Sequence, residues 1–358
     1  MDKLKAIILQ LSYTFPDDEA RYRFYKTEFD MLKEAGFEVE IRKATDGTGE
    51  EDQDTLINAV SDADVVVALG NPPFTRRVIE ALPRLKVIQR CGSGLNSVDM
   101  DAAAEHGKLV FFNPGYCAYE LAFHCAALIL ANLRSVCFYD RNMRQGQWKK
   151  GKGYVPRRMD EMTLGLFGLG GSAAHLAKMM HDGFGCRIIA TDPYIAKERA
   201  EELHAELVSF DTLITKSDII SLHVPLTKET FHIFNKDTFA KMKNDAMLIN
   251  IARGGLIDYD DLEEALRTGI IGFAGLDTFA KEPMPADHPL YRLDNVVLTP
   301  HSAYLGQGST KVYKYYSGWL PAEALNNHRI YKNHVANPAV LEKFTDWEII
   351  DRAPEAKI

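Results

Sequence analysis

Residues 163–192, TLGLFGLGGSAAHLAKMMHDGFGCRIIATD, decide the fold of this chain. The stretch begins with an apolar run of strand length, and residues 168–173 then fit the pattern G-x-G-x-x-G/A with alanine in the last place. Apolar residues recur at spacings near 3.6 over residues 174–184, which is typical of a helix. Residues 187–191 form a second apolar run that ends on Asp192. The stretch therefore predicts a strand, a helix and a second strand, with the glycines at the first turn.

Each residue type at that turn suits a bound dinucleotide. Gly168 permits the tight turn, Gly170 lets the backbone approach a pyrophosphate, and a small residue at Ala173 lets helix and strand pack closely. The first turn of the helix presents free N–H groups and a positive dipole end to the phosphates. We therefore expect Gly168, Gly170, Gly171 and Ser172 to bind the cofactor.

Asp192 stands at the offset of about 20 residues expected for an acid that holds ribose hydroxyls. A carboxylate there disfavours a 2′-phosphate, so the sequence predicts NAD as the cofactor rather than NADP. The alternative is a Gly-rich turn in an unrelated α/β protein. The strand before the motif, the helix after it and the acid beyond favour dinucleotide binding.

The composition of the chain limits its possible partners. Its 358 residues predict two domains, and 46% hydrophobic with 26% charged residues is ordinary for a globular protein. The formal charge of −8 argues against a nucleic-acid partner. A basic cluster at Lys149, Lys150, Lys152, Arg157 and Arg158 fits a solvated loop.

Nothing in the sequence indicates export, a membrane span or a metal site. The N-terminus lacks a signal-peptide pattern, and no apolar run reaches the roughly 18 residues of a membrane span. The five cysteines form no C-x-x-C pair. We therefore expect a cytoplasmic protein with buried thiols, no membrane partner and no metal.

Apolar runs along the whole chain alternate with helical patterns, which predicts doubly wound parallel sheets and an α/β fold. Strands are expected at residues 6–11, 37–42, 64–69, 87–90, 109–112, 219–224, 246–250, 272–276 and 296–298. Residues 120–134 predict a long apolar helix, and 140–148 an amphipathic continuation. The predicted domains are a first part at 1–116, a nucleotide-binding domain at 117–301, and a return to the first domain at 302–358. The tail from residue 345 could be frayed or could pack on a neighbour.

Three charged residues follow expected strands of the second domain. Arg253 precedes a Gly-Gly pair, Glu282 lies in GLDTFAKEP, and His301 follows VVLTP. In open α/β sheets the carboxyl ends of the strands face the ligand crevice, so three complementary groups there indicate a site. Taken singly, each has a plainer explanation: a surface ion pair for Arg253, turn chemistry for Glu282 and a loop cap for His301.

Several ordered segments extend this pattern: RCGSGLNSVD (90–99), NPGY (113–116), GLFGLGGSA (165–173), HVPLT (223–227), NIARGGLID (250–258), GLDTFAKEP (275–283) and LTPHSA (298–303). With them the chain resembles the D-isomer-specific 2-hydroxyacid dehydrogenase family over residues 40–338. The resemblance implies a Rossmann NAD-binding domain inserted in a flavodoxin-like, discontinuous substrate domain. It also implies an oxidoreductase that transfers hydride between NAD(H) and a small 2-oxo acid or D-2-hydroxy acid, acting on the CH–OH group of donors.

The resemblance assigns catalytic roles to three residues. His301 would give a proton to the substrate carbonyl oxygen, and Glu282 would hydrogen-bond His301 and favour its protonated form. Arg253 would polarise the carbonyl and bind the carboxylate through its planar fork. Trp148 resembles an aromatic residue that reaches a partner subunit in some relatives, and a homodimer is implied.

The remaining implied contacts concern cofactor and substrate. Backbone N–H groups of Gly92, Ser93 and Gly94 would grip the carboxylate, so the chemistry would need both domains. Asp277 would hold the nicotinamide carboxamide. Pro225, Thr227 and Ala252 would line the cofactor, whereas His124 is expected to be a satisfied core histidine.

The chain also departs from the family pattern. Gly171-Ser172 stands where Arg-Ile is common, Leu95-Asn96 replaces an aromatic residue and Asp, and Phe123 replaces an acid. These changes leave open which 2-oxo acid is used. Two other functions also remain open: an NAD(H)-sensing, corepressor-like binding protein on the same fold, and a formate- or phosphite-type dehydrogenase.

Overall fold

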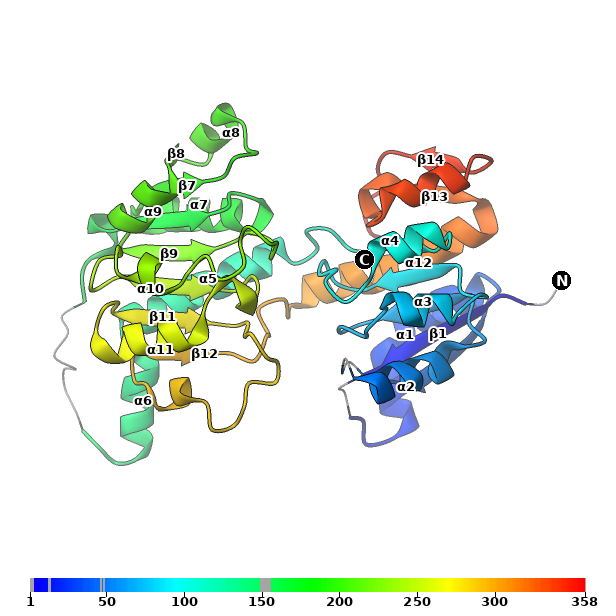
Figure 1. Ribbon diagram of the computed structural model, residues 1–358, viewed down its shortest axis with the longest axis horizontal. Helices are drawn as coiled ribbons and strands as arrows, with labels where there is room; N and C mark the ends of the chain where they lie inside the picture. The colour runs from blue at the N-terminus through cyan, green and yellow to red at the C-terminus, as the bar shows by residue number, and fades with distance from the viewer. Residues whose placement is uncertain (1–2, 12–13, 46, 48, 149–155, 358) are drawn as a thin grey trace. The chain divides into compact units, whose positions relative to one another are not determined.

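The structure is a computed structural model that describes residues 3–11, 14–45, 47, 49–148 and 156–357. The chain divides into two compact units (Figure 1). Unit 1 comprises Met1–Tyr116 and Gln307–Ile358, and unit 2 comprises Cys117–Gly306. Unit 2 thus ends at 306, where the sequence predicts 301. The three lysines of the expected basic cluster lie outside the described residues.

Unit 1 is a five-stranded parallel sheet with helices on both faces. The strand order is β2-β1-β3-β4-β5, the flavodoxin-like order that the resemblance implies. Its strands are β1 (Lys5–Gln10), β2 (Glu38–Lys43), β3 (Val65–Ala68), β4 (Val87–Arg90) and β5 (Leu109–Phe111). Its helices are α1 (Asp18–Glu34), α2 (Glu50–Val60), α3 (Arg76–Glu80), α4 (Met100–Glu105) and α12 (Gln307–Asn327). Strands β3, β4 and β5 are buried on both faces, which is why β3 and β5 appear in the sequence as unbroken apolar runs, whereas β4 also buries Gln89 and Arg90.

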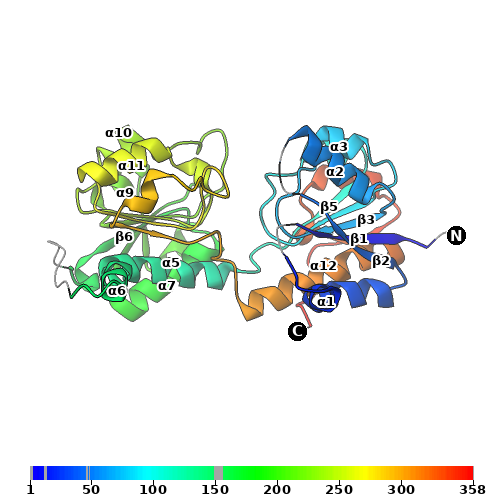
Figure 2. The same cartoon turned by 90° about the horizontal axis from the view of Figure 1, so that it is seen from below.

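The C-terminal part of the chain completes unit 1. Helix α12 packs along α1, and the two helices lie side by side below the sheet (Figure 2). Beyond α12, β13 (Arg329–Tyr331) pairs in parallel with β14 (Glu348–Ile350). The Tyr316 hydroxyl donates a hydrogen bond to the Pro354 carbonyl at 2.7 Å. The tail therefore packs on its own unit and is not frayed, an arrangement that the sequence analysis did not predict.

Unit 2 is a seven-stranded parallel sheet in the order β12-β11-β10-β9-β6-β7-β8. Its strands are β6 (Thr163–Phe167), β7 (Arg187–Thr191), β8 (Ala205–Leu207), β9 (Ile219–Leu222), β10 (Met247–Asn250), β11 (Phe273–Leu276) and β12 (Val296–Leu298). Helices α9 (Phe210–Lys216), α10 (Lys236–Phe239) and α11 (Tyr259–Thr268) cover one face (Figure 2). Helices α5 (Ala118–Leu133) and α7 (Gly171–Phe184) cover the other face, and α8 (Lys197–Glu202) leads into β8. Both units confirm the predicted α/β class with parallel sheets.

Two expectations for unit 2 need correction. The amphipathic segment does not continue the long helix, because the chain bends by 64° between α5 and α6 (Val136–Arg144). Ser135, at φ 51°, makes this break. The second correction concerns the thiols: Cys137 is exposed, whereas the other four are buried.

Within the described residues, no single helix is long and apolar enough to cross a membrane. The bent pair α5–α6 meets the criteria of length and apolar composition only when the two helices are taken together. Helix α5 packs against α7 and the sheet, with Cys125 and Ile129 fully buried. Its apolar character therefore serves the core of unit 2.

Candidate active site

The Gly-rich turn lies between β6 and α7, at the carboxyl end of the sheet. Gly168 has φ +89°, and a Cβ there would lie 2.9 Å from Val224 Cγ1 and 3.0 Å from the His223 carbonyl oxygen. Only glycine fits such a turn. Gly170 caps α7, and a Cβ on it would meet no atom within 4 Å. The backbone at Gly170 thus leaves room at a helix N-terminus, where a phosphate binds well.

Asp192 lies beside this turn, at the end of β7. Its Oδ2 accepts a hydrogen bond from the Leu169 N–H at 2.8 Å, and its Oδ1 accepts one from the Tyr194 N–H at 2.9 Å. These bonds orient the carboxylate, and each oxygen keeps a second lone pair. The geometry suits an acceptor for ribose hydroxyls, the role predicted from the sequence.

Ser172, in the first turn of α7, is held by His223, which follows β9, the strand that pairs with β6. Its hydroxyl lies 3.0 Å from His223 Nδ1, and His223 Nε2 lies 2.9 Å from the Ser221 hydroxyl. Burial lowers the pKa of His223 to about 4, so the ring is neutral near pH 7. The ring therefore links the two hydroxyls and orients the Ser172 side chain at the helix start.

The loop that carries Arg253 is shaped by a buried asparagine that the sequence analysis did not assign. Asn250, at the end of β10, donates to the Arg253 carbonyl at 2.9 Å and accepts from the Ala252 N–H at 3.0 Å. Arg253 Nη1 donates to the Ala252 carbonyl at 2.7 Å. A Cβ on Gly254 would fall 1.9 Å from the backbone of Phe279, so this loop touches the loop after β11. A polar residue closing the apolar strand MLIN is the signal that could have identified Asn250.

Glu282 and His301 form a hydrogen-bonded pair. His301 Nδ1 lies 2.6 Å from Glu282 Oε2, and Glu282 Oε1 accepts from the Phe279 N–H at 2.9 Å. The side chains of His301 and Glu282 are 38% and 34% exposed, so small molecules reach them. Burial raises the pKa of Glu282, but the hydrogen bonds from His301 and the Phe279 N–H and the charges of His301 and Arg253 outweigh it. The pKa of Glu282 is held below its usual value, and the group is ionised near pH 7.

Asp277 anchors the loop that carries His301. Its Oδ1 accepts from the Thr299 hydroxyl at 2.6 Å and the Ser302 N–H at 2.9 Å, and its Oδ2 accepts from the Ala303 N–H at 3.0 Å. The His301 N–H donates to the Asp277 carbonyl at 2.8 Å. The Asp277 side chain is only 1% exposed. Its hydrogen-bond partners Thr299, Ser302 and Ala303 all lie in unit 2. A contact with the nicotinamide carboxamide remains a prediction.

His124 reaches the same network from α5. Its Nε2 lies 2.9 Å from the Thr299 hydroxyl, and its side chain is 23% exposed. It is therefore hydrogen-bonded, as expected for a structural histidine.

The predicted residues of unit 2 all follow the carboxyl ends of its strands. After β9, the Thr230 hydroxyl accepts from the Thr227 N–H and donates to the Pro225 carbonyl, both at 2.8 Å. The remaining candidates follow β6 (Gly168, Gly170, Gly171, Ser172), β7 (Asp192), β10 (Ala252, Arg253), β11 (Asp277, Glu282) and β12 (His301).

Gly92, Ser93 and Gly94 belong to unit 1, where they follow the carboxyl end of β4. Asn113 braces this loop: its Nδ2 donates to the Cys91 carbonyl at 2.7 Å, and its N–H donates to the Gly92 carbonyl at 3.2 Å. The loop after β4 is thus held in place by Asn113, which follows the neighbouring strand β5.

Known proteins resemble this chain in sequence and in fold. Residues 126–303 match the family described as D-isomer specific 2-hydroxyacid dehydrogenase, NAD binding domain. The chain is 37% identical over 298 residues to a D-3-phosphoglycerate dehydrogenase of Archaeoglobus fulgidus, across 83% of this chain and 54% of that protein. It is 38% identical over 253 residues to a glyoxylate reductase of Korarchaeum cryptofilum, across 69% of this chain and 75% of that protein.

Among solved structures, the D-lactate dehydrogenase of Lactobacillus jensenii with NAD+ is 29% identical, with a TM-score of 0.70. The match covers 92% of this chain and 99% of that one. The chain spans about half the length of the D-3-phosphoglycerate dehydrogenase from A. fulgidus.

Proposed function

The chain belongs to the D-isomer specific 2-hydroxyacid dehydrogenase family, and we propose that it transfers hydride between NAD(H) and a small 2-oxo acid or its D-2-hydroxy acid. The observation that carries this proposal is the 2.6 Å pair of His301 and an ionised Glu282. The pair stands at the same sheet edge as the Gly-rich turn of a nucleotide-binding unit. A proton donor next to a nicotinamide site is what carbonyl reduction requires.

The residues of unit 2 fit NAD. The open backbone at Gly170 and the start of α7 suit the pyrophosphate, and the fixed carboxylate of Asp192 suits the ribose hydroxyls. When bound, the nicotinamide supplies the hydride in one direction and accepts it in the other. Ser172, oriented by His223, adds a hydroxyl where many relatives carry Arg-Ile.

The proton moves through His301. Its Nδ1 is engaged by Glu282, so Nε2 is the nitrogen that gives a proton to the carbonyl oxygen of the 2-oxo acid. The carbonyl carbon gains a hydride and its oxygen gains this proton, which makes the 2-hydroxy acid. The ionised carboxylate of Glu282 stabilises the protonated ring before the transfer, and the steps run backwards in oxidation.

Arg253 is the proposed partner of the substrate carboxylate. Its guanidinium presents two parallel N–H groups, a geometry that matches a carboxylate. Asn250 fixes the backbone that carries Arg253, which reduces the freedom lost on binding. We further propose that the backbone N–H groups of Gly92, Ser93 and Gly94, in unit 1, bind the substrate.

The substrate class rests on the names of the relatives. They include a D-3-phosphoglycerate dehydrogenase, a glyoxylate reductase and a D-lactate dehydrogenase, whose named compounds are all 2-oxo or 2-hydroxy acids. We propose that this chain also takes a small 2-oxo acid.

The test follows NADH oxidation at 340 nm against glyoxylate, hydroxypyruvate, pyruvate, and branched and aromatic 2-oxo acids. The His301→Ala variant serves as the inactive control. We expect rapid turnover of one member and a product of D configuration. No NADH oxidation with any of these acids, together with tight NADH binding, would instead favour an NAD(H)-sensing protein. NAD+ reduction by formate or phosphite alone would favour a formate- or phosphite-type dehydrogenase.

We also propose that the protein is a homodimer joined through α5 and α6. Four apolar side chains on these helices are more than half exposed: Tyr119 (58%), Phe123 (62%), Val136 (54%) and Met143 (51%). Tyr119 and Phe123 stack on each other with ring centroids 6.5 Å apart, and exposed apolar side chains grouped in this way often mark an interface. Trp148, just beyond α6, is 77% exposed.

Sedimentation velocity tests the dimer. The double variant Phe123→Glu/Val136→Glu is expected to sediment as a monomer, because two carboxylates would be buried in the contact. Tyr194→Glu is the matched control, since Tyr194 is 94% exposed on another part of unit 2. A monomeric native protein, or a double variant that remains dimeric, would rule out this surface.

A further inference from the structure

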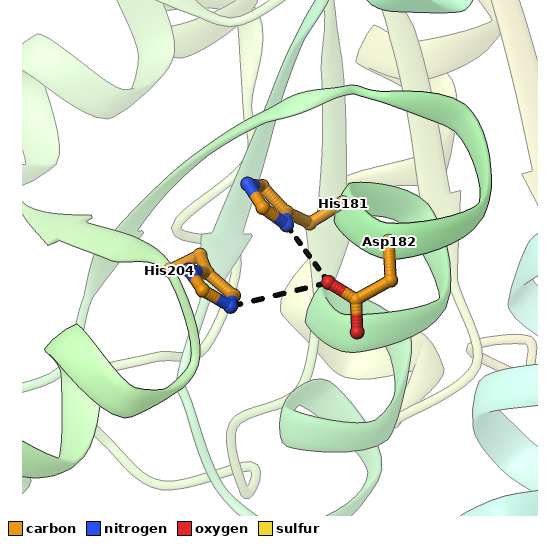
Figure 3. A group of neighbouring side chains, drawn as sticks. All are labelled: His181, Asp182 and His204. Atoms are coloured by element: carbon orange, nitrogen blue, oxygen red, sulfur yellow. Dashed lines mark hydrogen bonds and ion pairs between the residues drawn. The ribbon is translucent and has the colours of Figure 1, made fainter.

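Two histidines and an aspartate meet on the surface of unit 2, away from the groups discussed above (Figure 3). His181 Nδ1 lies 2.9 Å from Asp182 Oδ1, and His204 Nε2 lies 3.9 Å from the same oxygen. The two imidazole rings stack, with centroids 4.0 Å apart. Figure 3 shows both rings directing a nitrogen toward the one carboxylate oxygen.

The fold brings these residues together although 22 positions separate Asp182 from His204 in the sequence. His181 and Asp182 occupy the last turn of α7, which leads into β7. His204 lies between α8 and β8, and β7 pairs with β8 in parallel through Ile188 and Ala205. Both segments therefore stand at the amino ends of neighbouring strands.

The backbone of His204 also favours this arrangement. His204 has φ +57°, a left-handed conformation that few non-glycine residues adopt. The turn it makes between α8 and β8 directs the ring back over the end of α7. The side chain is about half exposed, so burial in the core does not account for its position.

We propose that His181, Asp182 and His204 bind a divalent transition-metal ion of the Zn2+ class. The three donor atoms lie within 4.8 Å of one another. With separations of 2.9 and 3.9 Å on two sides, a point equidistant from all three lies at most about 2.4 Å from each. Zinc bonds to imidazole nitrogen and carboxylate oxygen are about 2.0–2.2 Å long, so small shifts bring all three donors within range. One ring must also rotate out of the stack, because each nitrogen lone pair lies in the plane of its ring.

The donor set and its surroundings favour such an ion. Two imidazole nitrogens and one carboxylate oxygen suit Zn2+, Cu2+ or Ni2+ better than Mg2+ or Ca2+, which prefer oxygen alone. The C-terminal end of α7 carries the negative end of the helix dipole, which attracts a cation. Lys178, one turn earlier on α7, is the nearby positive charge that opposes binding.

This site is separate from the proposed reaction. It stands at the amino edge of the unit 2 sheet, whereas Asp192 and the Gly-rich turn stand at the carboxyl edge. The ion would link the end of α7 to the start of β8 and so stabilise unit 2. It would take no part in hydride transfer.

Titration calorimetry on the full chain tests the proposal. The protein carries no affinity tag, is stripped with a chelator, and receives ZnCl2. We expect one ion per chain and a melting temperature that rises with Zn2+ concentration. With Cu2+ in place of Zn2+, the electron paramagnetic resonance spectrum should show two nitrogen ligands.

Three variants locate the ion. His181→Ala is compatible with a helix, and His204→Gly suits a left-handed backbone, so both remove a donor without straining the fold. Each should weaken Zn2+ binding by more than about 100-fold, beyond what loss of an outer-shell partner costs. His175→Ala is the matched control, because His175 is exposed on the same helix.

The results decide the proposal whichever reaction the protein performs. Zn2+ binding that His181→Ala and His204→Gly both remove, with turnover and NADH binding unchanged, supports the site. Absence of binding in the native protein overturns it. Binding that survives both substitutions, or that His175→Ala weakens equally, also overturns it.

Discussion

Glu28 gives the sharpest test of the packing in unit 1. It lies on α1, only 2% exposed, where α12 crosses so closely that a Cβ on Gly318 would be 3.2 Å from Glu28 Cα. Among the described residues, its Oε2 has no hydrogen-bond partner. Burial raises the pKa of Glu28 to about 7, against the opposing charge of Lys314. We predict that Glu28→Gln stabilises the protein, and only at high pH.

The magnitude follows from proton linkage. The folded carboxyl keeps its proton up to about pH 7, whereas in the unfolded chain it loses the proton near its ordinary value of 4.5. Stability from this group is therefore full below pH 4.5 and is lost as pH rises through 7. The difference amounts to about 3 kcal/mol at most. Glutamine is neutral at every pH, so the variant keeps this stability at pH 8.5 and gains almost nothing at pH 4.5.

Urea unfolding at both pH values measures the effect. Trp319 and Trp347 belong to unit 1, so a Trp148→Phe background makes fluorescence report on that unit alone. Glu34→Gln is the control, because Glu34 is exposed on the same helix and should change stability little at either pH. An equal gain at pH 4.5 and pH 8.5, or a loss at pH 8.5, would refute the argument from a buried carboxyl.

Three further outcomes are expected in unit 2. His301→Ala should lower turnover by about 10²–10⁴-fold with NADH affinity nearly intact, and unchanged turnover would remove His301 from the mechanism. Asp192→Ala should weaken NAD+ binding and narrow the gap with NADP+ in fluorescence titrations; a native preference for NADP+ would contradict the cofactor assignment. The folded state resists protonation of His223, whose pKa falls from 6.5 to about 4, so acidification from pH 6.5 to 4 should cost about 3 kcal/mol. His223→Asn should remove that part of the acid sensitivity in urea unfolding, and an unaltered pH dependence would show that the ring takes up a proton without cost.

Buried parallel strands are the elements that the sequence predicts best. The runs at 64–69 and 109–112 become β3 and β5 to within one residue at each end, because strands covered on both faces need unbroken apolar residues. The Gly-rich turn is equally predictable from the sequence, because the local backbone conformation requires glycine there. The order of strands in each sheet is a longer-range property, and the family resemblance supplied it.

Other features depend on contacts that no local pattern encodes. The break between α5 and α6 falls at Ser135, without the glycine or proline that usually marks one. Asn250 acts through partners two and three residues away in a loop whose shape it helps to set. The meeting of His181 with His204 depends on the pairing of β7 and β8. Sequence spacing alone cannot indicate such a meeting, because it follows from the tertiary fold.

The packing of α12 on α1 has a consequence for how the protein is made. All of unit 2, residues 117–306, is synthesised between the strands of unit 1 and α12. At about 5–20 residues per second these roughly 190 residues occupy some 10–40 s on the ribosome, longer than most domains need to fold. The nucleotide-binding unit can therefore fold on the nascent chain before α12 is made. Until then, the face of α1 that α12 covers in the finished protein is exposed. Translation that stops before residue 307 leaves unit 1 without its last helix.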